Sequence, residues 1–370
     1  MSDDLRMTSL AMRGSAAFEQ AHGRRGTVTD KTDDKNLKEK KRWKDNLLSS
    51  SVPMEFEVSK LLVKHGFSTS ADYSYTRYGA QGRDDFSVDL HASIYLPYRR
   101  PNEITTEFQL LIECKHRHRN NKWLFFPDPN PGEFSTFTLG HTLRVVDDFA
   151  PVLLESQPSI AFDNKANFCL KGVEIDLNTG AVHDAEIRRG LAQLQYALPR
   201  LVTEAIEWNL GQHPEECCPF LYCPILLTTS EIVVAKTDTT IASVETAEAL
   251  SDLATPVPWV VVYCEQTQDF QRHRQATCDV LSGLVESGTT DWIDGVRKKA
   301  GVHDFVLPSA ACEELAGEYS RGRLSNYFGQ FIVCSLPHFE SLLKKLKTVA
   351  SKTDKTRKNL WVNPASTIPE

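Results

Sequence analysis

The chain has 370 residues, of which 41% are hydrophobic and 25% charged, a composition typical of globular proteins rather than of disordered or fibrous ones. Its formal net charge is −7, which argues against a protein that is basic overall and binds nucleic acid with its whole surface. No stretch approaches about 18 consecutive apolar residues, so we expect no transmembrane helix.

The cysteine pattern and the N-terminal segment both bear on location. The nine cysteines have no regular spacing, and Cys217 directly precedes Cys218, which fits neither a disulfide framework nor a zinc knuckle. The N-terminal segment MSDDLRMTSLAMRGS has early acids and no apolar core, unlike a secretory signal. We therefore expect a reducing, cytoplasmic compartment.

Composition shifts along the chain predict three regions. Residues 1–33 are polar and glycine-containing, and we expect little order there. Residues 34–48 are rich in lysine and predict a charged helix, which is more often a solvated surface than a DNA contact. We predict an N-terminal extension over residues 1–50, a main domain over 51–350 and a polar tail over 351–370.

The first helix of the main domain is predicted in SSSVPMEFEVSKLLVKHGF. Serines and Pro53 stand near its start and Gly66 at its end, which are the usual helix boundaries. Glu57 lies in the first turns of this helix. Its apolar residues recur with roughly helical period: Phe56, Leu61, Leu62 and Val63.

Two strands that we expect to pair as an antiparallel hairpin follow. Apolar and polar residues alternate over 86–94, as in a half-buried strand. After turn signals in YLPYRRPNEITTE, the segment EFQLLIECKHRH has a near-continuous apolar run. Such a run is typical of a central strand buried on both faces.

The remainder predicts a mixed sheet with helices. Residues 119–140 contain several prolines and predict a long loop, while 166–179 predict a strand. A helix is predicted at 184–210, with Pro199 as a potential kink. Short β-rich segments (FLYCPILLTT, EIVVAK and PWVVVYCE) then precede a last strand and helix (QFIVCSL and HFESLLKKLKTVA). The order predicts an α/β fold with a central mixed β-sheet flanked by helices.

Three residues on the predicted hairpin indicate chemistry. Glu113 and Lys115 are two apart on a strand and therefore share a face. If the strands pair, Asp89 lies near Glu113, and two acids and an amine meet at the end of a buried sheet. Buried charges are costly unless they are paired or bind a metal.

Other interpretations of these residues remain open. A structural ion pair at a sheet edge would explain them equally well from spacing alone. Asp84 or Asp85 would serve as the acid in place of Asp89, although Asp89 has the apolar flanks. Zinc bound by Cys114 and the histidines at 116 and 118 is disfavoured, because no cysteine pair with suitable spacing accompanies them.

The order of Glu57, Asp89 and the Glu113-x-Lys115 pair resembles the PD-(D/E)XK nuclease superfamily. The helix FEVSKLL is especially similar to the one that opens methylation-directed restriction nucleases and Holliday-junction-resolvase-like domains. The proline of the family name is absent before Asp89. The resemblance covers roughly residues 53–236 and implies a restriction-endonuclease-like core.

The resemblance also implies an accessory glutamine and tyrosine on the helix after the Glu-x-Lys strand. Gln193, Gln195 and Tyr196 lie on the matching helix. Their spacing departs from the family's Gln-x-x-x-Tyr form, which leaves their roles open.

The implied cofactor is Mg²⁺, for which Mn²⁺ is expected to substitute. Asp89, Glu113 and the backbone carbonyl of Cys114 provide the oxygen ligands that Mg²⁺ prefers. Lys115 is expected to orient a water and stabilise the transition state. Glu57 is expected to hold a metal-bound water or a second ion.

The implied activity is that of a DNA endonuclease in restriction or phage defence. Arg117, Arg119 and Lys122 directly follow the proposed site and are the expected phosphate contacts, with a solvated strand end as the equal alternative. Lysines near the C-terminus form a second basic segment. The expected partners are DNA and either a second copy of the chain or a defence-system protein. The alternative is a catalytically silent nucleic-acid-binding or interaction module with the same fold.

Overall fold

The computed structural model describes residues 42–79, 82–97, 106–129, 144–145, 167–211, 220–288, 315 and 327–362. The chain divides into two units, Met1–Asn46 and Leu47–Glu370, and the fold below is that of the second. The low order expected for residues 1–33 falls outside the described residues. Of the charged helix expected at 34–48, only residues 42–48 are described, and they are helical.

The second unit is built on one large mixed β-sheet of twelve strands. The order of ten of them across the sheet is β1-β2-β3-β8-β12-β11-β6-β4-β9-β10, while β5 pairs with β8 and β7 with β6. The strands are β1 (Ser68–Gly79), β2 (Gly82–Leu96), β3 (Thr106–Lys115), β4 (Asn121–Pro127), β5 (Arg144–Val145), β6 (Asn167–Asp176), β7 (Val182–His183), β8 (Phe220–Thr228), β9 (Glu231–Ala235), β10 (Ala254–Val257), β11 (Trp259–Tyr263) and β12 (Gln330–Ser335).

The predicted hairpin is confirmed, and the directions of its strands determine which strand ends lie together. β2 and β3 are antiparallel, with Leu90 opposite Ile112. β3 runs parallel to β8, with Lys115 opposite Thr228, and β8 runs parallel to β12, with Thr228 opposite Ser335. The carboxyl ends of the neighbouring strands β3, β8 and β12 therefore lie together, at the same end of these strands.

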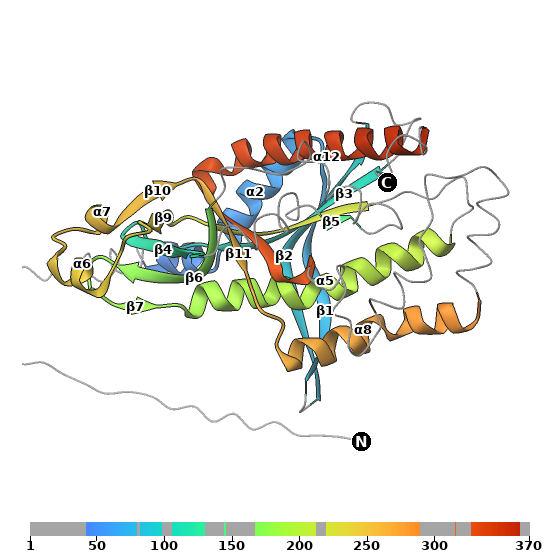
Figure 1. The fold of residues 1–370 in the computed structure, drawn as a ribbon, viewed down its shortest axis with the longest axis horizontal. Helices are drawn as coiled ribbons and strands as arrows, with labels where there is room; N and C mark the ends of the chain where they lie inside the picture. The colour runs from blue at the N-terminus through green and yellow to red at the C-terminus, as the bar shows by residue number, and fades with distance from the viewer. Residues whose placement is uncertain are drawn as a thin grey trace, which may run out of the picture. The chain divides into compact units, whose positions relative to one another are not determined.

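Helices cover both faces of the sheet (Figure 1). α2 (Val52–Lys64) and α12 (Phe339–Val362) lie on one face, while α5 (Ala185–Gly211) and α8 (Gln268–Glu286) lie on the other. Two short helices, α6 (Ile241–Thr246) and α7 (Leu250–Leu253), connect β9 to β10.

β3 is buried on both faces, as its apolar run predicts. Leu110 and Ile112 belong to the core cluster that includes Val58 of α2. Leu111 belongs to the opposite cluster, with Leu194 of α5. A charged group at the end of this strand is therefore held at the junction of two apolar cores.

The structure corrects three details of the predicted elements. The loop expected at 119–140 contains a strand, β4, in its described part. The first strand of the sheet, β1, was not predicted. The last helix continues to Val362, well into the tail expected from residue 351.

None of the helices in the described ranges is long and apolar enough to cross a membrane.

Candidate active site

Asp89 and Glu113 lie side by side where the β2–β3 ladder ends. The last pair of the ladder is Leu90 and Ile112; Asp89 precedes Leu90 and Glu113 follows Ile112, so the two acids come directly after this pair. The backbone N–H of Cys114 donates a hydrogen bond of 2.6 Å to Asp89 Oδ2. This bond fixes the carboxylate of Asp89 against the strand that carries Glu113 and Lys115.

Glu113 is an acid held almost entirely away from solvent. Its exposed fraction is 1%, and burial, followed by the charge of Asp89, raises its pKa from the ordinary 4.5 to about 7 despite the opposing charge of Lys115. Its Oε1 accepts a hydrogen bond from Lys115 Nζ at 2.7 Å. Its Oε2 is buried and has no hydrogen-bond partner among the described groups. A buried carboxylate oxygen without a donor is unusual, because such groups are nearly always satisfied.

Lys115 is held from two elements. Its amine, on a side chain 14% exposed, also donates to Gln193 Oε1 of α5 at 3.2 Å. Gln193 Nε2 in turn donates to the backbone carbonyl of Ser87 at 3.2 Å. Of the three accessory residues predicted on this helix, Gln193 thus reaches the site and links both strands of the hairpin to α5.

The close approach of α5 to the site depends on a glycine. A Cβ on Gly190 would lie 2.5 Å from Leu226 Cδ1 and 3.3 Å from Lys115 Cε. The first distance is far inside van der Waals contact. Gly190 therefore allows α5 to pack close enough for Gln193 to touch Lys115.

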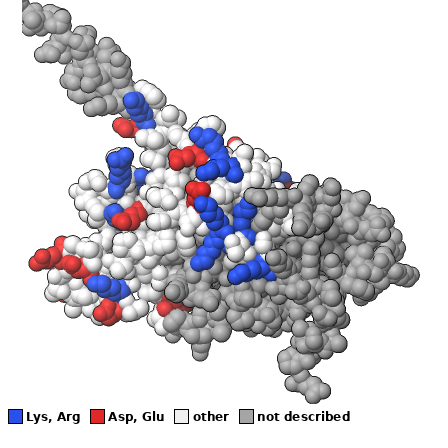
Figure 2. All heavy atoms as spheres, turned by 90° about the horizontal axis from the view of Figure 1, so that it is seen from above, with Lys and Arg blue, Asp and Glu red and all other residues white. Residues whose placement is uncertain are grey.

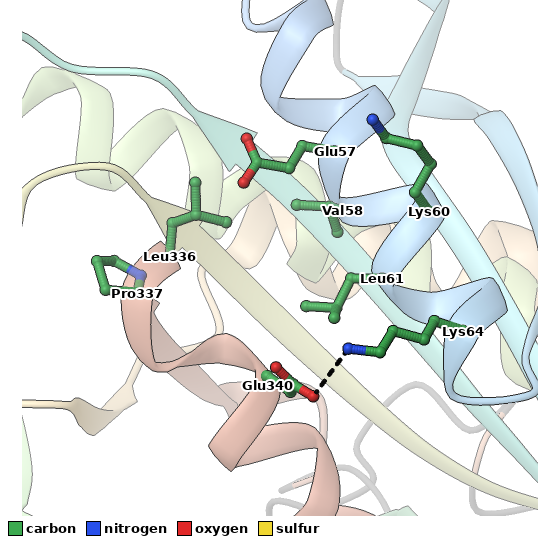
Figure 3. Close-up of a pocket in the computed structure, with 8 residues that line it drawn as sticks. All are labelled: Glu57, Val58, Lys60, Leu61, Lys64, Leu336, Pro337 and Glu340. Carbon is green, nitrogen blue, oxygen red and sulfur yellow. Dashed lines mark ion pairs between the residues drawn. The ribbon is translucent and has the colours of Figure 1, made fainter.

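The acid that α2 contributes is Glu55, not Glu57. Burial, followed by the charges of Asp89 and Asp72, raises the pKa of Glu55 to about 7, while Lys115 lowers it. Two residues along a helix are separated by about 200°, so Glu57 points away and is exposed. It lines a groove with Leu336 and Pro337, which directly precede α12, and with Glu340 of α12 (Figure 3).

Asp72 of β1 completes an acidic neighbourhood that the sequence did not reveal. Its charge raises the pKa of both Glu55 and Asp89. For Asp89 burial is the largest cause, and the Cys114 N–H opposes it. Asp72 has a left-handed φ of 55° and interrupts the β1–β2 ladder between Ala71 and Tyr73. The pattern of polar and apolar residues in this segment does not predict such an interruption.

The other two accessory residues serve packing in this structure. Gln195 is buried and donates to the backbone carbonyl of Phe328 at 3.2 Å. The Tyr196 hydroxyl donates to Asp269 Oδ2 at 2.9 Å, and the Arg77 guanidinium lies 4.0 Å from its ring centroid. Neither residue is among the hydrogen-bond partners of Lys115, which are Glu113 and Gln193.

Two of the three predicted phosphate contacts are already engaged in ion pairs. Arg117 Nε and Nη2 bind Glu174 at 2.8 and 2.5 Å, and Glu174 is fully buried. Lys122 pairs with Glu231. Arg119 is exposed and forms no ion pair with a described residue.

The two alternative acids lie away from the site. Asp84 and Asp85 are exposed at the far end of β2, and Asp85 accepts a hydrogen bond from Thr76 at 2.9 Å. Within the described ranges no group of three or more His, Cys, Asp or Glu side chains is arranged to hold a metal ion.

The face formed by α2 and α12 carries exposed and half-buried lysines. Figure 2 shows Lys and Arg side chains gathered there. The lysines are Lys60, Lys64, Lys344, Lys345, Lys347 and Lys352. One acid on this face, Glu340, is compensated by Lys64 at 3.5 Å and Lys344 at 3.3 Å. The basic residues that the sequence indicates beyond 352 lie outside the side chains described.

No protein-family model, curated protein or solved structure matches the chain.

Proposed function

We propose that the chain is a metal-dependent nuclease that hydrolyses phosphodiester bonds in DNA. The observation that carries the proposal is the buried Oε2 of Glu113, which has no hydrogen-bond partner among the described groups. The same carboxylate lies beside Asp89 and accepts a hydrogen bond from Lys115 through Oε1. Leaving a carboxylate oxygen unsatisfied at a site shared by two acids costs free energy. A bound divalent cation would recover that cost.

The donor set fits Mg²⁺, with Mn²⁺ as a substitute. Mg²⁺ takes oxygen ligands, keeps several waters and is usually held by one or two carboxylates. Asp89 and Glu113 would hold it, with the Cys114 carbonyl as the third candidate and Glu55 facing its waters. When bound, the cation supplies Lewis acidity towards a phosphate and a lowered pKa of its water.

The chain's own residues then have distinct tasks. Lys115 presents a positive charge towards a phosphate oxygen, and the charge that develops there in the transition state strengthens that contact. Gln193 holds the amine in place, because it is anchored to Ser87. Glu55 accepts a proton or orients a water, since its pKa of about 7 lies near neutral pH.

The fold is compatible with a restriction-endonuclease-like core, in which an antiparallel hairpin carries the acids and a following helix packs on the site. DNA as the substrate, endonuclease action and a defence role rest on the resemblance of the motif. The exposed Lys60 of α2 and Lys352 of α12, which form no ion pair with a described residue, are better candidates for phosphate contacts than Arg117 and Lys122, which do. A local basic face on a chain of net charge −7 is the expected footprint of such contacts.

A cleavage assay tests the proposal. Supercoiled plasmid is incubated with the full chain and Mg²⁺, with EDTA as the metal-free control. We expect Lys115→Ala to lose at least about a hundredfold in rate, as for the loss of a group that stabilises the transition state. Lys171→Ala, which removes an exposed lysine on β6, is the matched control. Equal cleavage by wild type and Lys115→Ala would show a contaminating nuclease.

A catalytically silent module, or a nuclease that requires a partner, would give no cleavage at all. Calorimetric titration with Mn²⁺ separates these cases. Binding that Glu113→Gln and Asp89→Asn abolish supports the metal site even without turnover. The absence of binding by the wild-type chain would leave only the silent module.

A further inference from the structure

A second site lies on the same face of the sheet as Glu113 but well away from it. A groove of about 240 Å³ opens between β1, β2, β3 and the second half of α5. Glu107, which lines the groove, is six residues before Glu113 on β3, or about 20 Å along the strand. The groove is therefore no part of the candidate active site.

The groove is dominated by aromatic rings. Tyr95 and Trp208 are 45% and 49% exposed, unusually high for such large rings. Tyr73 packs against His91 with ring centroids 5.3 Å apart. All four rings line the cavity, and the Arg200 guanidinium already lies 5.4 Å from the Tyr73 ring centroid. A bound group would therefore meet the exposed rings of Tyr95 and Trp208.

The same groove holds two acids with different roles. Glu204 accepts hydrogen bonds from Arg200 at 2.6 Å and from the Tyr73 hydroxyl at 2.7 Å, so it anchors Tyr73. Glu107 accepts one hydrogen bond, from Gln109 at 2.9 Å, and has no ion-pair partner in the part of the chain that the structure describes. It lies directly opposite Tyr95 in the β2–β3 ladder.

We propose that this groove binds a protonated alkylamine, with the ammonium held by Glu107 and the Tyr95 and Trp208 rings. Aromatic faces attract cations through their quadrupole, and the attraction adds to a carboxylate nearby. Phosphate or another anion is disfavoured because Glu107 would repel it. A neutral apolar ligand would cover Glu107 without pairing its charge, which is costly.

The volume accommodates one aliphatic ammonium chain. A lysine side chain on a partner protein and a free polyamine share this chemistry. The contacts are exposed and few, so we expect dissociation constants on the order of millimolar.

Saturation-transfer NMR with the full chain tests the proposal. The probes are Nα-acetyl-lysine N-methylamide, 1,5-diaminopentane and the uncharged Nα-acetyl-norleucine N-methylamide. We expect the two amines to bind and the norleucine analogue to bind at least about fivefold more weakly. Binding of only one amine identifies the peptide or the free polyamine as the source.

Matched variants locate the site. Glu107→Gln keeps the shape and removes the charge, and we expect about fivefold weaker amine binding. Trp208→Leu should weaken binding similarly, while Glu286→Gln, at the exposed end of α8, should not. Equal binding of the norleucine analogue, or unchanged amine binding by Glu107→Gln, would overturn the proposal. Cleavage plays no part in this experiment, so it does not depend on the nuclease activity.

Discussion

The amine of Lys115 donates a hydrogen bond to the side-chain oxygen of Gln193 at 3.2 Å, which couples the end of β3 to α5. The same amine lies 2.7 Å from Glu113 Oε1. Gln193 cannot remove the lysine's charge, but it limits the orientations that the amine adopts. It is therefore a positioning residue that acts through Lys115.

Gln193→Ala should lower kcat about tenfold or more and change KM little, because a hydrogen bond to a charged group contributes about 1.5–3 kcal/mol. Steady-state cleavage of a short duplex measures both constants. Arg188→Ala, an exposed position on the same helix, is the control. An unchanged kcat together with a lowered thermal midpoint would mean that Gln193 serves packing alone.

The raised pKa of Glu113 predicts how stability depends on pH without metal. The folded chain keeps a proton up to about pH 7, whereas an unperturbed glutamate releases it near 4.5. Between these values the folded state binds more protons than the unfolded state, so the free energy of unfolding should fall as pH rises. Glu55, also raised to about 7, adds to the same slope.

Urea unfolding in EDTA at about pH 5 and about pH 8 measures this slope. Glu113→Gln should flatten it, because the amide does not titrate. Excess Mg²⁺ should oppose the loss at high pH, because the cation binds the ionised carboxylates. A slope that is the same in wild type and Glu113→Gln would contradict the assignment.

The periodicity of apolar residues and the residues typical of helix ends were enough to predict the elements that carry the site. The paired strands of Asp89 and Glu113 follow from alternation and from one long apolar run, and α2 follows from Pro53 and Gly66. β1 was missed because its segment STSADYSYTRYG is mostly polar, and only Tyr73 and Tyr75 pack against the core. β4 was missed because a strand of seven residues stands beside several prolines.

The side-chain partners were harder to predict, because they depend on elements far away in sequence. Arg117 was expected to bind phosphate, but its Nε and Nη2 donate hydrogen bonds to Glu174, 57 positions later. Glu57 was predicted by resemblance, whereas Met54, Val58 and Leu62 are the residues of α2 that are buried against the sheet. The apolar stripe predicted for this helix included Phe56 and Val63, but both side chains are exposed, so the predicted stripe was wrong about which side of α2 is buried.

The Arg117–Glu174 pair should matter for stability rather than for DNA binding. Glu174 is buried and also accepts hydrogen bonds from Asn121 and Trp123, and together these outweigh burial and hold its pKa below the ordinary value. Arg117→Ala should destabilise the fold by about 3–5 kcal/mol, since it leaves a buried charge without its main partner. Arg119→Ala should change stability by less than about 0.5 kcal/mol. Chemical unfolding measures the free energy of unfolding of both variants. Similar losses of this free energy in the two variants would show that the buried pair contributes little.

Two glycines in helices give a matched pair for packing at the site. Gly190→Ala should destabilise by about 1–3 kcal/mol despite the better helix propensity of alanine, because the new Cβ meets Leu226. Gly283→Ala on α8 has open space around its Cβ and should stabilise by up to about 1 kcal/mol. Urea midpoints measure both changes. A stabilised Gly190→Ala would mean that α5 can move away from β8 at little cost.

The two acids of α2 provide the sharpest test of which side chains surround the cation. Glu55→Gln should weaken Mn²⁺ binding several-fold, because the pKa of Glu55 responds to both Asp89 and Lys115. Glu57→Gln removes the same charge from the exposed groove beside α12 (Figure 3) and should leave affinity within about twofold, since separated exposed charges are screened by salt. Titration calorimetry at moderate ionic strength compares the variants directly. A larger loss for Glu57→Gln than for Glu55→Gln would place the cation on the α12 side of α2 and exclude the arrangement built on Asp89 and Glu113.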